Sequence, residues 1–149
     1  MKYDSSAEIL LVEDNLTDAE LIVRALHRHK LDQRVFIVKD GEEALDYLLQ
    51  RGRYAGAQEF HLPKVVFLDL KLPKITGLQV LQAVREDERT QCIPVVMLTS
   101  SRELTDVRTA YAYGANSYVV KPIDFAAFAD TVAQLGLYWL QVNEGSRLQ

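Results

Sequence analysis

Short apolar runs alternate with longer amphipathic segments along the chain. The runs are rich in valine, isoleucine and leucine and span only four or five residues each. Runs of this length and composition are typical of strands in a buried parallel sheet. The pattern predicts strands at residues 9–12, 34–38, 65–68, 94–98 and 117–120.

Between these runs, apolar positions recur every three or four residues, which predicts amphipathic helices. In the first such segment Leu21, Ile22 and Leu26 share one face, while Glu20 and Arg24 lie on the other. The capping signals are Asp14 or Asn15 before the first helix, Asp124 before the last and Gly114 after the fourth. Helices are expected at residues 16–29, 42–49, 78–84, 104–113 and from Asp124 onward.

Five successive pairs of a strand and a helix predict an α/β fold. Such alternation gives a parallel sheet with helices on both faces. We expect a single domain over residues 8–142, with tails at 1–7 and 143–149. The stretch 51–64 is long for a connection in this class, where about 2–6 residues are usual.

Composition narrows the class of protein without changing this fold. The chain has 149 residues with a net charge of −4, and basic residues are outnumbered 17 to 21 by acidic ones. This balance disfavours a nucleic-acid-binding domain. The only cysteine is Cys92, which suits a reducing cytoplasm. With no leader-like segment and no apolar run near the ~20 residues of a membrane span, we expect a cytoplasmic protein.

Polar residues follow four of the five predicted strands directly. Glu13 and Asp14 follow the first strand, and Asp69 follows the third. Thr99 and Lys121 follow the fourth and fifth. The carboxyl ends of parallel strands share one edge of the sheet, where ligands bind in open α/β folds. We therefore expect these side chains to converge in one crevice.

Such a cluster favours phosphoryl chemistry. Clustered carboxylates repel one another, and a hard dication such as Mg²⁺ between them relieves that repulsion. Lys121 can supply a point charge for a phosphoryl oxygen, and Thr99 can supply a hydroxyl. Asp69 is the candidate nucleophile, because an aspartyl carboxylate can carry a covalent phosphoryl group. If the cluster is only structural, the acidic pair caps a helix and Lys121 pairs with it.

Four segments together resemble the CheY-like receiver domain of two-component response regulators. They occur in the family's order, each at a strand end, and the resemblance covers residues 8–140. The segments are Leu11-Val12-Glu13-Asp14-Asn15, Asp69-Leu70-Lys71-Leu72-Pro73 with Gly77, Leu98-Thr99-Ser100-Ser101 and Tyr118-Val119-Val120-Lys121-Pro122. The resemblance implies a flavodoxin-like, doubly wound sheet of five strands in the order 2-1-3-4-5.

The resemblance also implies roles in phosphorylation. Asp69 would accept a phosphoryl group from the phosphohistidine of a sensor histidine kinase. Glu13, Asp14 and Asp69 would hold Mg²⁺ together with the backbone carbonyl of Lys71. Lysine is a departure at this position, and we expect it to alter the lifetime of the phosphoryl group. The protein would catalyse only its own phosphorylation and slow dephosphorylation, and is not expected to be an enzyme.

The remaining motif residues imply a switch. Thr99 and Lys121 would bind the phosphoryl group, and the Lys121–Pro122 peptide bond would be cis. Thr99 would move toward the phosphoryl group as Tyr118 rotates inward. This pairing would change the surface formed by the fourth helix, the fifth strand and the last helix.

The layout around the motifs gives a narrower resemblance. The insertion at 51–64, the long last helix and the absence of an output domain are similar to the small regulators that partner bacterial phytochrome kinases. We therefore expect a phytochrome-type kinase partner and an output made by direct contact. Two apolar stripes on the last helix favour a homodimer. The candidate interface residues are Tyr111, Phe128, Val132, Leu135, Tyr138 and Trp139.

Three other functions compete with the phosphoacceptor. A phosphorylation-independent adaptor would keep the residues without using them, and would bind its partner unchanged when Asp69 becomes Asn. A phosphatase with an aspartyl nucleophile needs a second aspartate two residues later, where this chain has Lys71. Nucleotide binding of the flavodoxin type is disfavoured, because no glycine-rich loop follows the first strand.

Overall fold

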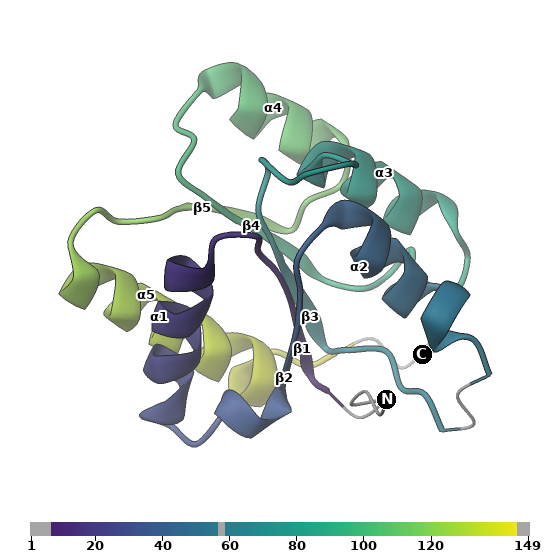
Figure 1. Cartoon of the computed structure of the whole chain (residues 1–149). Coiled ribbons are helices and arrows are strands. Elements are labelled where there is room, and N and C mark those ends of the chain that lie inside the picture. Colours follow the sequence, from purple (N-terminus) through teal and green to yellow (C-terminus); the bar gives the residue numbers. More distant parts are fainter. Residues whose placement is uncertain (1–6, 57–58, 146–149) are drawn as a thin grey trace.

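Five strands form one parallel sheet in the order β2-β1-β3-β4-β5, as the resemblance implied (Figure 1). The computed structural model describes residues 7–56 and 59–145. The strands are β1 (Ile9–Val12), β2 (Val35–Val38), β3 (Val65–Leu68), β4 (Val95–Thr99) and β5 (Ser117–Val120). Three of them, β1, β3 and β4, are buried along their whole length, which explains why they contain few polar residues.

Helices cover both faces of the sheet (Figure 1). They are α1 (Leu16–His27), α2 (Gly41–Leu48), α3 (Gly77–Glu86), α4 (Leu104–Ala112) and α5 (Phe125–Leu137), with short 3₁₀ turns η1 (Asp32–Arg34) and η2 (Gly52–Tyr54). Along β1, Ile9 and Leu11 join the core under α1 and α5, and Leu10 and Val12 join the core on the opposite face. None of the described helices is long and apolar enough to cross a membrane.

The predicted capping residues stop and start the helices close to the expected positions. Asn15 rather than Asp14 caps α1, because its Oδ1 accepts the Asp18 N–H at 3.0 Å. Asp124 caps α5 through the Ala127 N–H at 2.8 Å. Gly114 ends α4 with φ of +100°, a left-handed conformation that favours glycine. The bounds of β1, β3 and β5 are those predicted, and the ends of the other predicted elements differ by no more than two residues.

The long last helix is buried on two sides, by the sheet and by α1. It continues past Leu137 as one π-helical turn, η3 (Tyr138–Val142). At Gly136 a Cβ would lie 2.5 Å from Leu26 Cδ2 of α1, so α1 and α5 pack in close contact there. Phe128 and Val132 are only 4% and 0% exposed within this core. Their assignment to a dimer interface was therefore wrong: this apolar stripe packs inside the protomer.

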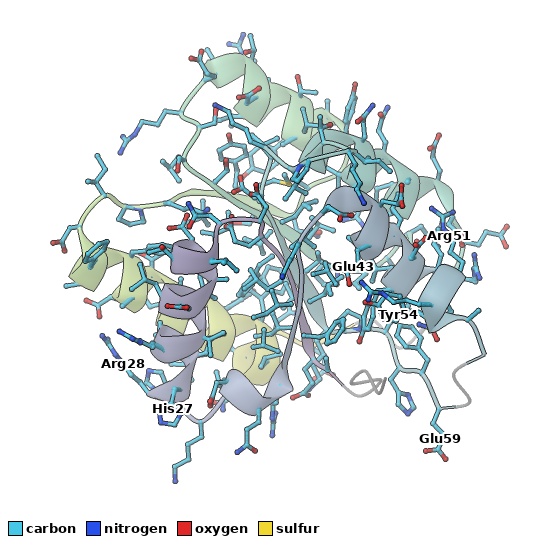
Figure 2. The ribbon with its side chains drawn as sticks, viewed as in Figure 1. His27, Arg28, Glu43, Arg51, Tyr54 and Glu59 are labelled. Atoms are coloured by element: carbon cyan, nitrogen blue, oxygen red, sulfur yellow. The ribbon has the colours of Figure 1, made fainter. Side chains whose placement is uncertain are left out.

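The insertion at 51–64 is anchored beside α2. Buried Tyr54 donates its hydroxyl proton to Glu43 Oε2 at 2.7 Å, and Arg53 pairs with the same oxygen at 2.5 Å. Figure 2 shows Glu43 and Tyr54 side by side at this position. The rings of Tyr54 and Phe60 each stand edge-on to Tyr47, with centroids 5.3 Å apart. Part of the insertion thus extends the core on the α2 side.

Candidate functional site

The predicted site residues meet at one edge of the sheet. The backbone ladder continues one residue beyond the strands: Asp69 N–H donates to the Val12 carbonyl at 3.2 Å, and Lys121 N–H to the Thr99 carbonyl at 2.8 Å. Glu13 N–H likewise donates to the Val38 carbonyl at 3.0 Å. These bonds fix the site residues on the rigid sheet and not on mobile loops.

Three carboxylates converge at this edge. Glu13, Asp14 and Asp69 each offer one oxygen, and these oxygens lie within 4.8 Å of one another. Glu13 is 2% and Asp69 9% exposed, whereas Asp14 is exposed. Hard oxygen donors this close together suit a small dication, which would offset their mutual repulsion. The donor set therefore fits Mg²⁺.

The Lys121 ammonium lies among the carboxylates. Its Nζ donates to Glu13 Oε1 at 2.6 Å, to Asp18 Oδ2 at 2.8 Å and to Asp69 Oδ2 at 3.1 Å. Burial acts to lower the pKa of Lys121, but the hydrogen bonds to Asp18 and Glu13 outweigh it and raise that pKa. Lys121 is therefore a permanent cation beside Asp69.

For Glu13, unlike Lys121, burial is the effect that decides the direction of the pKa shift. Burial raises its pKa from 4.5 to about 7, although the hydrogen bond from Lys121 acts to lower it and the charge of Asp69 raises it further. A single ammonium shared among three carboxylates does not neutralise them all. The raised pKa of Glu13 indicates that the site as it stands favours an additional positive charge.

The expected switch residues both bond to Ser101. The buried Thr99 Oγ1 accepts the Ser101 N–H at 3.4 Å, and the Tyr118 hydroxyl donates to the Ser101 carbonyl at 3.0 Å. Burial raises the pKa of Tyr118, so its hydroxyl remains a donor at neutral pH. Ser101 itself donates through Oγ to Asp106 in the first turn of α4, at 2.5 Å. Ser101, the last residue of the Leu98-Thr99-Ser100-Ser101 segment, is thus the link to α4.

The loop after β3 folds back tightly onto Asp69. Gly77 N–H donates to the Leu70 carbonyl at 2.8 Å, and a Cβ at Gly77 would lie 2.1 Å from the Asp69 carbonyl oxygen. Only glycine fits this approach. Lys71 lies in the same loop with its side chain exposed, and its N–H donates to Asp69 Oδ1 at 3.4 Å.

Two features of the site differ from the sequence analysis. The Lys121–Pro122 bond is trans, since the described residues contain no cis peptide bond. Trans is favoured by about 0.5–1 kcal/mol before proline, and the next residue, Ile123, is 91% exposed, so little packing opposes that preference. Asp18 was not among the predicted site residues. Acidic residues are common in the first turn of any helix, so its position alone gave no distinct signal.

Comparison with known proteins agrees with this geometry. Residues 9–133 match the model of the response regulator receiver domain. The chain belongs to the receiver family of response regulators. It is therefore a receiver-domain protein of two-component signalling, and its sheet has the CheY-like order.

Individual relatives match over nearly their whole length. FilR2 of Methanothrix harundinacea is 44% identical, over 91% of this chain and 84% of the relative. Rcp1 of Synechocystis is 33% identical over 89% and 88%, and its Mn²⁺-bound crystal structure superposes with a TM-score of 0.85. The phosphorylated cyanobacterial phytochrome response regulator RcpA is 36% identical, covers 92% and 96%, and also has a TM-score of 0.85. The chain is thus related to phytochrome response regulators.

Proposed function

We propose that this receiver accepts a phosphoryl group on Asp69 from a sensor histidine kinase. The supporting observation is the placement of Lys121 Nζ 3.1 Å from Asp69 Oδ2, at the edge where Glu13 and Asp14 add two further carboxylates. An Asp69 oxygen attacks phosphorus, the P–N bond of the phosphohistidine breaks, and the imidazole leaves with the electron pair. Lys121 and Thr99 then bind phosphoryl oxygens, and phosphoryl transfer depends mainly on such positioning and charge neutralisation.

Mg²⁺ is the proposed cofactor. Glu13, Asp14, Asp69 and the Lys71 carbonyl would hold it, and its charge would offset that of the incoming phosphoryl oxygens. The related regulator Rcp1 has been crystallised in an Mn²⁺-bound form. Mn²⁺ also favours oxygen ligands, so this supports divalent-cation binding by the carboxylate oxygens of this chain.

The phosphatase alternative lacks its general acid. Lys71 occupies the position two residues after Asp69, where that class needs an aspartate. The adaptor alternative predicts that binding to a partner does not depend on Asp69.

We place the receiver unit at residues 8–142 and the protein in the cytoplasm, acting as a phosphoacceptor and not as a turnover enzyme.

Intact-mass spectrometry tests the acceptor chemistry. The protein is incubated with acetyl phosphate and Mg²⁺, beside an Asp69→Asn variant and a sample with excess EDTA. We expect a mass gain of one phosphoryl group in the wild type with Mg²⁺ only. A phytochrome kinase replaces acetyl phosphate as donor in the second arm. No gain with either donor would reject the proposal in favour of the adaptor.

The relation to RcpA and Rcp1 supports a phytochrome-type kinase as the donor. The discriminating measurement is the initial rate of transfer from a phosphorylated phytochrome kinase and from an unrelated histidine kinase. We expect the phytochrome to be faster by at least tenfold, roughly 1.4 kcal/mol in the transition state. Equal rates would contradict this assignment.

We also propose a homodimer through the remaining candidates. Tyr111 of α4 is 50% and Tyr138 of η3 47% exposed, and Leu135 of α5 and Trp139 of η3 are half-buried. The Trp139 ring stands edge-on to that of Tyr138, with centroids 5.0 Å apart. Aromatic residues of this exposure are favoured at interface centres. Sedimentation equilibrium should show dimers that Tyr138→Lys weakens. Phe125→Lys, at the other end of the same helix and 68% exposed, is the control and should leave the dimer intact.

A further inference from the structure

Lys121 contacts three carboxylates, and an ammonium has only three protons to donate. Each proton serves one acceptor: Glu13 at 2.6 Å, Asp18 at 2.8 Å and Asp69 at 3.1 Å. The three acceptors come from three different elements: the end of β1, the first turn of α1 and the end of β3. The position of the ammonium is therefore set jointly by these three carboxylates.

The three acceptors do not have the same duties. In the proposed function Asp69 carries the phosphoryl group and Glu13 binds the metal. Both must change their bonding when those ligands arrive. Asp18 has neither duty, its side chain is 25% exposed, and α1 fixes its backbone. It is the one partner of Lys121 that can stay in place through the reaction.

We propose that Asp18 is a positioning residue of the phosphorylation site: it orients Lys121 toward the phosphoryl group and sets the balance between cation and anion binding. The inference rests on the proposed function. Transfer of a phosphoryl group adds negative charge at Asp69. The ammonium of Lys121 attracts this added charge, whereas the nearby carboxylate of Asp18 repels it. The same carboxylate strengthens the field that attracts Mg²⁺.

Charge and position can be separated by two substitutions. Asp18→Asn removes the charge but keeps an oxygen that can accept from Lys121 Nζ, whereas Asp18→Ala removes both. Glu20→Gln is the matched control, because it removes one carboxylate from the exposed side of the same helix. All three protons of Lys121 are already assigned, so Glu20 does not position the ammonium.

Two titrations measure the effect of removing the charge of Asp18. Isothermal titration calorimetry gives the affinity for Mg²⁺, and a second titration gives the affinity for beryllofluoride, a phosphoryl analogue, at saturating Mg²⁺. We expect Asp18→Asn to weaken Mg²⁺ binding and to strengthen beryllofluoride binding, each by roughly threefold to tenfold, and Glu20→Gln to change either by less than about twofold. Equal effects of the two variants, or no effect of Asp18→Asn, would overturn the proposal.

The alanine variant follows the positioning effect. Without an acceptor on α1, Lys121 gains freedom, so Asp18→Ala should lose the gain in beryllofluoride affinity that Asp18→Asn shows. Equal beryllofluoride affinities in the Asn and Ala variants would show that Asp18 acts only through its charge, and would overturn its positioning role.

A metal-free measurement separates this inference from the proposed function. Thermal midpoints in EDTA are compared for Asp18→Asn, Lys121→Met and the double variant. If Asp18 and Lys121 interact as the distances indicate, the two shifts will not add. Additive shifts would overturn the inference even if Asp69 is phosphorylated. Non-additive shifts in a protein that takes up neither beryllofluoride nor a phosphoryl group would show instead that the proposed function fails.

Discussion

Glu13 lies 2.6 Å from an ammonium, yet its pKa is raised and not lowered. Burial is the larger effect, because the side chain is almost inaccessible to water and Lys121 also serves Asp18 and Asp69. This carboxyl therefore titrates much closer to neutral pH than an ordinary glutamate does. Its protonation links the site to pH in two measurable ways.

The first concerns metal binding. A protonated Glu13 must lose its proton before it can bind Mg²⁺, so affinity should fall by up to about tenfold for each pH unit below 7. Calorimetric titrations between pH 6 and 8, repeated in buffers of different ionisation enthalpy, should show proton release on binding. Glu13→Gln should bind more weakly at pH 8 and lose most of this pH dependence. An unchanged dependence in Glu13→Gln would assign the proton to another group.

The second concerns stability without metal. A carboxyl whose pKa is higher in the folded state, about 7 against 4.5, adds stability at low pH that is lost as pH rises through 7. From pH 6 to pH 8 this loss should be about 1 kcal/mol in the unfolding free energy. Urea unfolding in EDTA measures it, with Glu13→Gln as the control. A variant whose unfolding free energy falls as steeply as that of the wild type would contradict the assignment.

At the scale of elements, Arg85 joins α3 to the segments that follow α4 and precede β4. Its guanidinium donates to the Gly114 carbonyl at 2.8 and 2.9 Å, to the Ile93 carbonyl at 2.7 Å and to Asn116 Oδ1 at 2.8 Å. A further bond reaches the Gln91 carbonyl at 3.1 Å. One side chain thus satisfies carbonyls at the end of α4 and ahead of β4.

Arg85→Lys should destabilise the fold although it keeps the charge. An ammonium has three donors and cannot reproduce the planar fork, so carbonyls in this half-buried region lose their partners. We expect a loss of about 2–3 kcal/mol in urea unfolding, from the cost of unsatisfied acceptors. Arg89→Lys, on an exposed arginine paired with Asp87, should cost much less, because solvent screens an exposed ion pair. Similar losses in the two variants would show that the network adds little.

Whether a feature could be predicted from the sequence depends on how far apart its interacting residues lie along the chain. The strands and the residues that follow them were predictable, because buried strands need apolar runs and Glu13, Asp69 and Lys121 end those runs. Arg85 was not predictable, since its partners at Gly114 and Asn116 lie 29 and 31 positions away. The same separation along the chain explains the wrong prediction for the apolar stripe of α5.

The apolar stripe of α5 illustrates the same limit. A stripe shows that a helix face is buried but not what buries it. Phe128 and Val132 were predicted to contact a second protomer, but they pack in the core shared with α1. Gly136 carried a usable signal, because a glycine inside a helix favours close approach of another backbone or side chain.

At the scale of the whole molecule, Ser101 connects the site to the surface of α4. Its backbone N–H contacts Thr99, its carbonyl accepts from Tyr118, and its hydroxyl donates to Asp106. If Thr99 turns toward a phosphoryl oxygen, the Ser101 N–H loses its acceptor. The bond to Asp106 then resists movement of the loop, because Asp106 is fixed in the first turn of α4.

Asp106→Ala should therefore make the movement of Thr99 easier and weaken the response of α4 to it. With Ser101 released, less free energy opposes the movement of Thr99, and beryllofluoride should bind about threefold to tenfold more tightly. Amide hydrogen exchange at the start of α4 should be faster without ligand, and its change on adding beryllofluoride should be smaller. Asp130→Ala removes an exposed carboxylate of α5 that pairs with Arg28, and should alter neither quantity. Tighter binding with an unchanged exchange response at α4 would place the coupling outside Ser101 and Asp106.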